Sequence, residues 1–339
     1  MSDNFAAPLS ITNSADSAWR YLLSRFTPAG TQGKLSIVLF HRVLIAPDPL
    51  FPGDPDVKRF DELCGWLAAW YNVLPLDEAV DRLSRGALPV RALAITFDDG
   101  YADNHDLAVP ILRKHGLCAT FFIATGFLNG GRMWNDTAVA AVRQCSQASL
   151  DLSDLGLAGV SQLDLSSITA RRQSLDRLLN AIKYLPPDER EAVVDRVAAL
   201  ADARLPTDLM MRAEQVLAMA NAGMQIGAHT VSHPILARLN GADARREIAQ
   251  SKSDLEGLLK RPVTLFAYPN GKPVQDYLPR DAALVRDLGF TAAVSTAYGA
   301  ALYAEDRLFD LPRFTPWDRG RWAFATRLAR NLYTNTLAA

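Results

Sequence analysis

The sequence predicts an α/β barrel, and three features of the chain indicate it. Short apolar segments rich in β-branched or aromatic residues alternate with segments of helical periodicity. The strand-sized segments are apolar at nearly every position, which is typical of parallel strands buried on both faces. Seven or eight such units within 339 residues favour a barrel over an open sheet, although periodicity alone leaves closure undecided.

Two sets of elements follow from these patterns. The predicted strands are Leu35–Phe40, Asn72–Leu76, Leu93–Phe97, Ala119–Ala124, Met224–Ala228, Val263–Ala267, Thr291–Ser295 and a last candidate, Leu311–Phe314. The predicted helices between them are Val57–Trp70, Leu76–Ser84, Asn104–His115, Arg212–Ala222, Ala242–Leu259 and Arg280–Leu288.

The order of the elements predicts three parts. Residues 1–34 form an N-terminal arm, residues 35–316 form the barrel, and residues 317–339 form a C-terminal helix outside it. Within the barrel, residues from about 134 to 211 contain helical patterns but no strand pattern, so we expect a helical insertion there.

Composition narrows the class of ligand and the location. The chain carries 36 basic and 37 acidic side chains, which argues against a nucleic-acid partner and favours a neutral ligand such as a sugar. No apolar segment is long enough to span a bilayer. Met1–Asn13 lacks a basic start followed by an apolar core, so we expect no secretory signal and a cytoplasmic location. Nothing in the sequence indicates an oligomeric state.

Two adjacent carboxylates, Asp98 and Asp99, follow the predicted strand Leu93–Phe97. Ligands of parallel α/β folds gather at the carboxyl ends of strands, and neighbouring carboxylates there repel each other unless a positive charge lies between them. One of them could bind a divalent cation while the other faces substrate. A solvated turn with Asx hydrogen bonds is the alternative interpretation.

Two histidines four residues apart, His229 and His233, follow the predicted strand Met224–Ala228. In a helical turn or a tight loop, both imidazoles can reach one ion at about 2.0–2.1 Å. With Asp99 they would form a set of two histidines and one carboxylate that leaves positions open for water and substrate. A structural role for the pair is the alternative.

Three further features could contribute to the same rim. His41 follows the first predicted strand, although it could equally be a hydrogen-bonded loop residue. Tyr268 and Asn270 lie in a Tyr-Pro-Asn-Gly turn that could contact substrate and direct a backbone N–H toward an oxyanion, or could be an ordinary surface turn. Arg313 interrupts an apolar stretch, and it could pair with Asp98 or form a surface salt bridge.

Taken together, these motifs resemble the polysaccharide deacetylase family, the NodB-homology group also called carbohydrate esterase family 4. The Thr-Phe-Asp-Asp-Gly sequence that ends at Gly100 and the His-Thr-x-x-His-Pro sequence that begins at His229 match the first two motifs of that family in order and position. The resemblance implies a distorted (β/α) barrel of about seven strands. It also implies a divalent metal, with Zn²⁺ expected first and other ions open, held by Asp99, His229 and His233, and it makes Asp98 the general base.

Two departures from the family pattern change the expected roles. The third motif carries Ala267 and Asn270 where the family has an Arg and a Tyr, so we expect Arg313 to supply the missing Arg. No His follows His233, although the family carries a late histidine as general acid. The Phe40-His41-Arg42-Val43 segment resembles an early motif of the poly-N-acetylglucosamine deacetylase branch, which implies that His41 is the acid.

The predicted activity is therefore metal-dependent removal of an N-acetyl or related acyl group from an amino sugar. The substrate would be a carbohydrate in a polysaccharide, a glycolipid or a lipid- or nucleotide-linked precursor. Two alternatives stay open: an O-acetyl esterase or other C–N amidase on the same fold, and a non-catalytic carbohydrate-binding protein derived from it.

Overall fold

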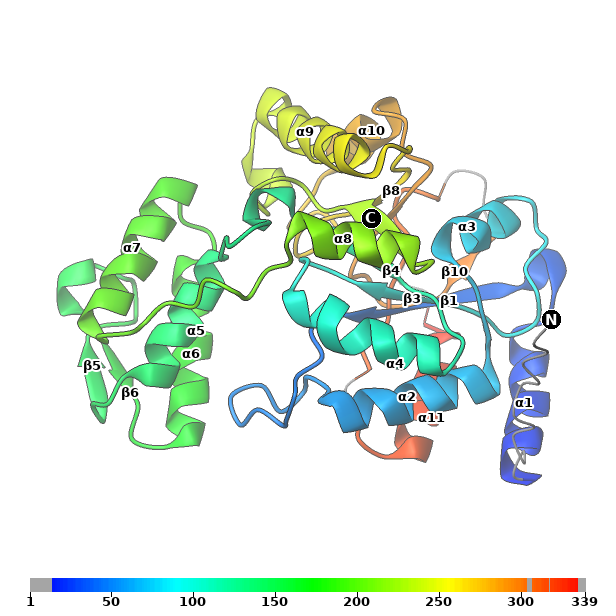
Figure 1. Cartoon of the computed structure of the whole chain (residues 1–339), viewed down its shortest axis with the longest axis horizontal. Coiled ribbons are helices and arrows are strands. Elements are labelled where there is room, and N and C mark those ends of the chain that lie inside the picture. The colour runs from blue at the N-terminus through cyan, green and yellow to red at the C-terminus, as the bar shows by residue number, and fades with distance from the viewer. Residues whose placement is uncertain (1–13, 304–306, 317, 335–339) are drawn as a thin grey trace, which may run out of the picture.

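A mainly parallel sheet of eight strands forms the centre of the molecule (Figure 1). The structure, a computed structural model, describes residues 14–303, 307–316 and 318–334. Seven strands follow the order β10-β1-β3-β4-β7-β8-β9, and β2 pairs with β3 beside them. Their bounds are β1 Lys34–Phe40, β2 Asn72–Val73, β3 Ala92–Phe97, β4 Thr120–Ile123, β7 Gln225–Ala228, β8 Leu265–Ala267, β9 Ala292–Val294 and β10 Ala301–Leu302. The predicted distorted (β/α) barrel is confirmed.

An irregular segment lies between the two ends of the row of parallel strands. Leu311 forms a parallel bridge with Val294 of β9, and Phe314 forms one with Val38 of β1. The predicted strand Leu311–Phe314 is therefore wrong as a regular strand, because Pro312 has no N–H to donate to a ladder. The short strand β10, which the sequence did not indicate, pairs antiparallel with the start of β1.

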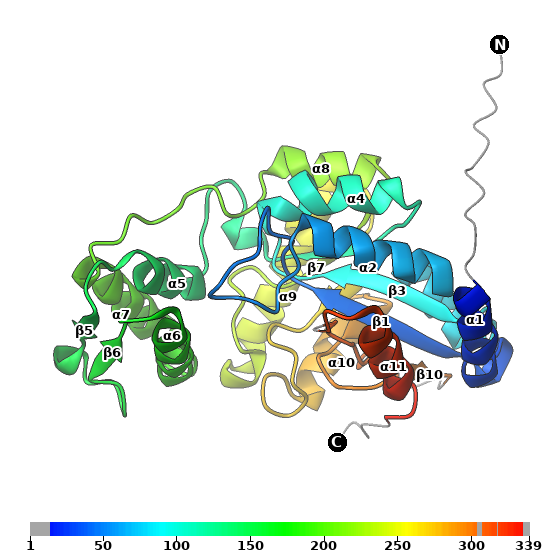
Figure 2. The ribbon, with the colours of Figure 1, turned by 90° about the horizontal axis from the view of Figure 1, so that it is seen from below.

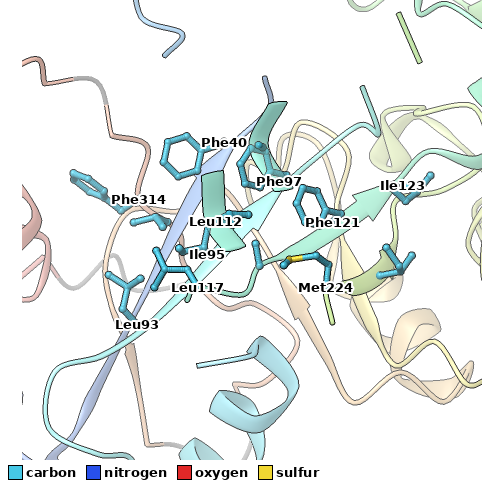
Figure 3. Close-up of a cluster of buried hydrophobic side chains, with 14 of the residues drawn as sticks. Phe40, Leu93, Ile95, Phe97, Leu112, Leu117, Phe121, Ile123, Met224 and Phe314 are labelled. Atoms are coloured by element: carbon cyan, nitrogen blue, oxygen red, sulfur yellow. The ribbon is translucent and has the colours of Figure 1, made fainter. Parts of the chain in front are cut away.

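Alternate residues of the strands pack into two separate cores. On β3, Ala92 and Ala94 belong to the core inside the barrel, and α3 (Leu76–Ser84) closes one end of that core. Leu93, Ile95 and Phe97 point outward into a larger core beneath the helices (Figure 3). Because side chains alternate with a period of two, Thr96 and Asp98 continue the inward-facing row of β3.

Helices surround the outer core (Figures 1 and 2). They are α2 Val57–Trp70, α4 Val109–Lys114, α8 Ala213–Asn221, α9 Gly241–Leu259 and α10 Pro279–Asp287. The predicted helices agree with them to within one or two residues, except that a wider helical turn at Asn104–Ala108 precedes α4. Pro110 lacks the N–H needed for a regular bond to the preceding turn, which accounts for the wider geometry.

The predicted insertion forms a lobe beside the barrel (Figures 1 and 2). Its elements are α5 Trp134–Gln144, β5 Ser149–Asp151, β6 Gln162–Asp164, α6 Ile168–Ile182 and α7 Pro187–Leu200. They share a hydrophobic core of their own. The expectation that this region contains no strand is wrong, because β5 and β6 pair as a short antiparallel ladder. Each strand has three residues with one buried side chain, too short to give a readable alternation.

The described parts of both terminal segments pack on the barrel. The predicted arm 1–34 contains α1 (Ser14–Phe26), whose Asp16 accepts a hydrogen bond from the Trp70 indole at 2.8 Å. The predicted C-terminal helix is shorter than expected, since α11 spans Arg321–Asn331. Residues 1–13 of the arm, together with 317 and 335–339 of the C-terminal segment, lie outside the described residues. Among the described helices, none has both the length and the apolar character needed to cross a bilayer.

Candidate metal and catalytic site

Parallel pairing brings the ends of β3, β4 and β7 to one edge of the barrel. Phe97 of β3 pairs with Phe121 of β4, and Ile123 of β4 pairs with Ala228 of β7. Asp98 and Asp99 leave the end of β3 at this edge, and His229 leaves the end of β7. The predicted convergence of residues more than a hundred positions apart is therefore present in the fold.

Asp99, His229 and His233 form a compact group of ligand atoms. Asp99 Oδ1 lies 3.4 Å from Nε2 of His229 and 3.4 Å from Nε2 of His233. All three ligand atoms lie within 4.8 Å of one another. A tetrahedral ion with bonds of about 2.0–2.1 Å would separate its ligand atoms by about 3.3 Å. This donor set of two nitrogens and one oxygen thus fits Zn²⁺ or a similar divalent ion.

Hydrogen bonding, burial and neighbouring charges set the protonation states of the three side chains. His229 Nδ1 lies 2.8 Å from the Ala267 carbonyl oxygen, so Nδ1 donates to that oxygen and Nε2 faces Asp99. Burial acts to lower the pKa of His229, but Asp98 and Asp99 outweigh it and the net pKa is raised, so a bound cation would displace a proton from Nε2. Burial lowers the pKa of His233 to about 4, against the opposing charge of Asp99. Burial acts to raise the pKa of Asp99, but its contacts with His229 and His233 outweigh that effect and hold the pKa well below its usual range. The carboxylate is therefore ionised and the His233 imidazole neutral at neutral pH, as metal ligands must be.

The loops that carry these groups have strained backbones. Asp99, His233 and Asn270 all adopt positive φ angles, of 78°, 52° and 60° respectively. Such angles are rare for residues other than glycine and concentrate at functional sites, where surrounding contacts hold them in place.

Glu247 of α9 supplies part of that support for the histidine loop. Its Oε2 accepts hydrogen bonds from the Val231 and Ser232 N–H groups, each at 2.9 Å, and its Oε1 accepts one from the Ser232 hydroxyl at 2.7 Å. No sequence motif indicates this role, because α9 lies outside the histidine motif and only the tertiary fold brings Glu247 to the loop.

Replacing Glu247 with Ala should weaken metal binding about 10–100-fold, the usual effect of losing a group that orients metal ligands. Glu247→Gln should weaken it less, because an amide oxygen still accepts from both N–H groups. Competition titration against a chromophoric chelator measures the metal affinity of both variants. Unchanged affinity in the Ala variant would show that Glu247 does not hold the histidine loop.

Asp98 and Arg313 form a buried bidentate ion pair. Nη1 and Nη2 of Arg313 donate to Oδ1 and Oδ2 of Asp98 at 2.7 and 2.6 Å, and Nε donates to the Ser295 carbonyl at 2.8 Å. Burial would raise the pKa of Asp98, but the Arg313 charge and the nearby imidazoles more than offset it, and the net pKa is lowered. The irregular segment between β9 and β1 places Arg313 inside the barrel, so the geometry has the pair that the sequence predicted.

Arg313→Met should destabilise the protein by about 3–5 kcal/mol at neutral pH, because it leaves a buried carboxylate unpaired. The pH dependence contributed by Asp98 should also reverse. In the native protein its lowered pKa adds stability above the unfolded value of about 3.9, and that stability is lost as pH falls through the folded pKa. Without Arg313, burial raises the folded pKa, so the variant should lose stability as pH rises.

Urea unfolding at about pH 5 and about pH 8 tests this reversal. The matched control is Arg246→Met, which removes an exposed surface pair with Asp243 and should change stability by less than about 1 kcal/mol. Equal losses in the two variants, or a loss in Arg313→Met that does not depend on pH, would contradict the assignment.

The other predicted residues have different positions. His41 is exposed at the rim, where its charge contributes to lowering the pKa of both Asp98 and Asp99. Asn270 lines the cavity beside Asp99 and His233, and its N–H donates to no protein acceptor in the described part of the chain. Tyr268 does not reach the cavity. It points into the outer core, stacks on Tyr277 and donates to the Phe309 carbonyl at 2.9 Å.

The prediction that Tyr268 contacts substrate is therefore corrected. Ala267 belongs to the inner core, and the alternation of β8 turns the next side chain outward. Asn270 lies two positions further on and returns to the site edge.

A cavity of about 210 Å³ adjoins the candidate metal group. Asp99, His233 and Asn270 line it from the barrel, and Trp134 and Arg190 are among the residues that line it from the insertion. The helical lobe is thus one wall of the site. The sequence predicted the lobe but not this contribution.

The fold and this group of residues define a class, a (β/α) barrel with an Asp-His-His group and a buried Asp-Arg pair at the carboxyl ends of its strands. Residues 85–176 and 191–293, more than half of the chain, match the sequence profile described as Polysaccharide deacetylase. The chain belongs to the polysaccharide deacetylase family.

Individual relatives share a smaller part of the sequence. The chain is 35% identical over 92 residues to the Bacillus subtilis (strain 168) protein named "Putative polysaccharide deacetylase YxkH", a match that covers 26% of this chain and 32% of the relative.

Solved structures extend the likeness to nearly the whole fold. IcaB from Ammonifex degensii superposes with a TM-score of 0.57 at 18% identity, covering 90% of this chain and 98% of that one. The Streptococcus pyogenes deacetylase PplD, in complex with acetate, gives a TM-score of 0.54 at 20% identity, covering 83% and 92%. At these identities the structural likeness establishes the fold alone.

Proposed function

We propose that this protein is a metal-dependent hydrolase that removes an N-acetyl group from an amino sugar in a polysaccharide, a glycolipid or a sugar precursor. The observation that carries the proposal is the Asp99, His229 and His233 group beside the ionised Asp98. Membership of the polysaccharide deacetylase family supports the substrate class. The donor set supports a divalent ion, with Zn²⁺ as the first candidate.

A divalent ion bound by these three residues would polarise the acyl oxygen and lower the pKa of an attacking water. Asp98 accepts the proton of that water, and Arg313 keeps its carboxylate ionised and fixed in orientation. The free N–H of Asn270 donates a hydrogen bond to the acyl oxygen as negative charge develops there. His41 donates a proton to the leaving nitrogen, which cannot depart as an anion.

Acetate release tests the proposed activity against its alternatives. An N-acetylated chito-oligosaccharide and an O-acetylated xylo-oligosaccharide are each incubated with the protein, with and without a chelator. We expect release from the N-acetylated sugar that the chelator abolishes. Release from the O-acetylated sugar alone would indicate an esterase, chelator-resistant release would refute metal dependence, and no release from either would contradict the proposal.

His41→Ala should lower activity on an N-acetyl sugar by about 10²-fold or more, the usual contribution of a general acid. The same variant should act nearly normally on an aryl acetate, whose phenolate leaves without protonation. Steady-state rates on the two substrates provide the comparison. Equal losses on both, or no loss on the N-acetyl sugar, would exclude His41 as the acid.

A further inference from the structure

A buried arginine that has no hydrogen-bond or ion-pair partner among the described residues lines the cavity beside the proposed catalytic group. Arg190, near the start of α7, is 6% exposed. Its Nε is buried without a hydrogen-bond partner, and no hydrogen bond or ion pair of its guanidinium occurs within the described residues. Its Cζ lies 5.0 Å from the centre of the Trp134 ring, so Trp134 covers one face and leaves the edge of the guanidinium free.

The other buried arginines differ from Arg190 because each of them donates hydrogen bonds. Within the described residues, these other buried arginines are Arg91 and Arg313. Arg91 donates to the Trp70 carbonyl at 2.9 Å, and Arg313 donates to Asp98 and to a backbone carbonyl. A buried guanidinium without an acceptor costs free energy. Arg190 therefore carries a charge that no residue in the described part of the chain neutralises.

The charged groups near Arg190 that the structure describes form no ion pair with it. Burial lowers the pKa of Arg190, while its exposed chain neighbour Glu191 acts in the opposite direction without forming an ion pair. Arginine stays protonated under such conditions. Lys183 adds a second positive charge to the same wall, and its Nζ lies 3.8 Å from Asp276 Oδ1, a loose contact. On the barrel side of the cavity, the Asp99 carboxylate faces the imidazoles of His229 and His233.

We propose that Arg190 binds an anionic oxygen group, a phosphate or a carboxylate, carried by the substrate next to the acetylated sugar. This inference rests on the proposed deacetylase function and narrows its substrate to charged carbohydrates, such as a sugar phosphate or a saccharide containing a uronic acid. A guanidinium presents two parallel donors that match either group. Its burial beside Trp134 strengthens the interaction by excluding water, and the shared cavity brings the anion close to Asp99 and His233.

The test compares Arg190→Met, Arg190→Lys and the wild type, all as metal-loaded full-length chains. Arg196→Met is the matched control, because Arg196 lies on the same helix but is exposed. Isothermal titration with inorganic phosphate and with glucuronate measures anion binding without reference to activity. We expect Arg190→Met to weaken binding of at least one anion about tenfold or more, Arg190→Lys to weaken it less, and Arg196→Met to leave it unchanged. The anion whose binding is weakened more shows whether the group on the substrate is a phosphate or a carboxylate.

Acetate release provides the second measurement. For N-acetylglucosamine 1-phosphate and a glucuronate-containing N-acetylated disaccharide, Arg190→Met should raise KM for the substrate with the matching anion about tenfold. KM for a neutral chito-oligosaccharide should rise much less. The melting temperature of Arg190→Met should stay at or above the wild-type value, because the variant removes an unpaired buried charge.

The outcomes separate this inference from the proposed function. If the wild type deacetylates sugars and Arg190→Met affects neutral and charged substrates equally, or binds both anions normally, the anion site is refuted and the deacetylase stands. If no sugar is deacetylated but Arg190→Met still loses anion binding, the proposed function fails and the anion site stands. A large fall in melting temperature with equal loss on all substrates would assign Arg190 a structural role and overturn the inference.

Discussion

Replacing Asp98 with Asn should reduce turnover by about 10²–10⁴-fold while the protein keeps its bound ion. The amide cannot accept a proton from the attacking water, and Asp98 is not among the three proposed ligands. Asp99→Asn should lose activity together with metal affinity, because Asp99 Oδ1 faces both imidazoles at 3.4 Å. Turnover and metal content, measured on the same preparations, therefore distinguish two adjacent carboxylates.

Stability must be controlled in this experiment, because Asp98→Asn leaves Arg313 buried without its carboxylate. The double variant Asp98→Asn with Arg313→Gln removes the unpaired charge and should recover most of the lost stability without recovering turnover. Near-wild-type turnover in Asp98→Asn, or recovery of turnover in the double variant, would contradict the role of Asp98 as base.

Removing one of the two proposed imidazole ligands should also reduce metal affinity and activity strongly. His229→Ala should bind the ion at least about 10²-fold more weakly and lose nearly all activity, because His229 is 1% exposed and its Nε2 faces Asp99. Chelator treatment should inactivate the wild type, and added Zn²⁺ should restore it. Zn²⁺ added at a stoichiometric concentration should not restore the activity of His229→Ala.

His105→Ala is the matched control for this prediction. His105 is partly exposed and contacts Asp106, away from the proposed ligands. The control should keep both metal and activity. Comparable metal binding by His229→Ala and His105→Ala would refute the proposed ligand set.

The features that could be predicted from the sequence are those that local patterns encode. The helices Val57–Trp70 and Leu76–Ser84 have the predicted bounds, because their apolar periodicity covers the full length of each element. The residues at the ends of β3 and β7 converge as expected, because parallel strands direct their carboxyl ends to one edge.

Other features depend on tertiary contacts, and no local sequence pattern predicts them. The side chain of Tyr268 turns outward although its motif lies at the site, since the orientation depends on the register of β8. Glu247 and Arg190 acquire their positions from α9 and from the inserted lobe, both distant in sequence from the motifs. The pairing of β5 with β6 depends on strands of three residues. The cytoplasmic location stays a prediction.

Locating the metal ion itself tests whether Asp99, His229 and His233 bind it. Crystals of the protein loaded with Zn²⁺ would be measured at the zinc absorption edge, and an anomalous difference map would be calculated. We expect one strong peak per chain, about 2.0–2.2 Å from an Asp99 carboxylate oxygen and from Nε2 of His229 and His233. A fully loaded protein with no peak between these residues, or with its ion bound by other side chains, would show that Asp99, His229 and His233 are not the metal ligands.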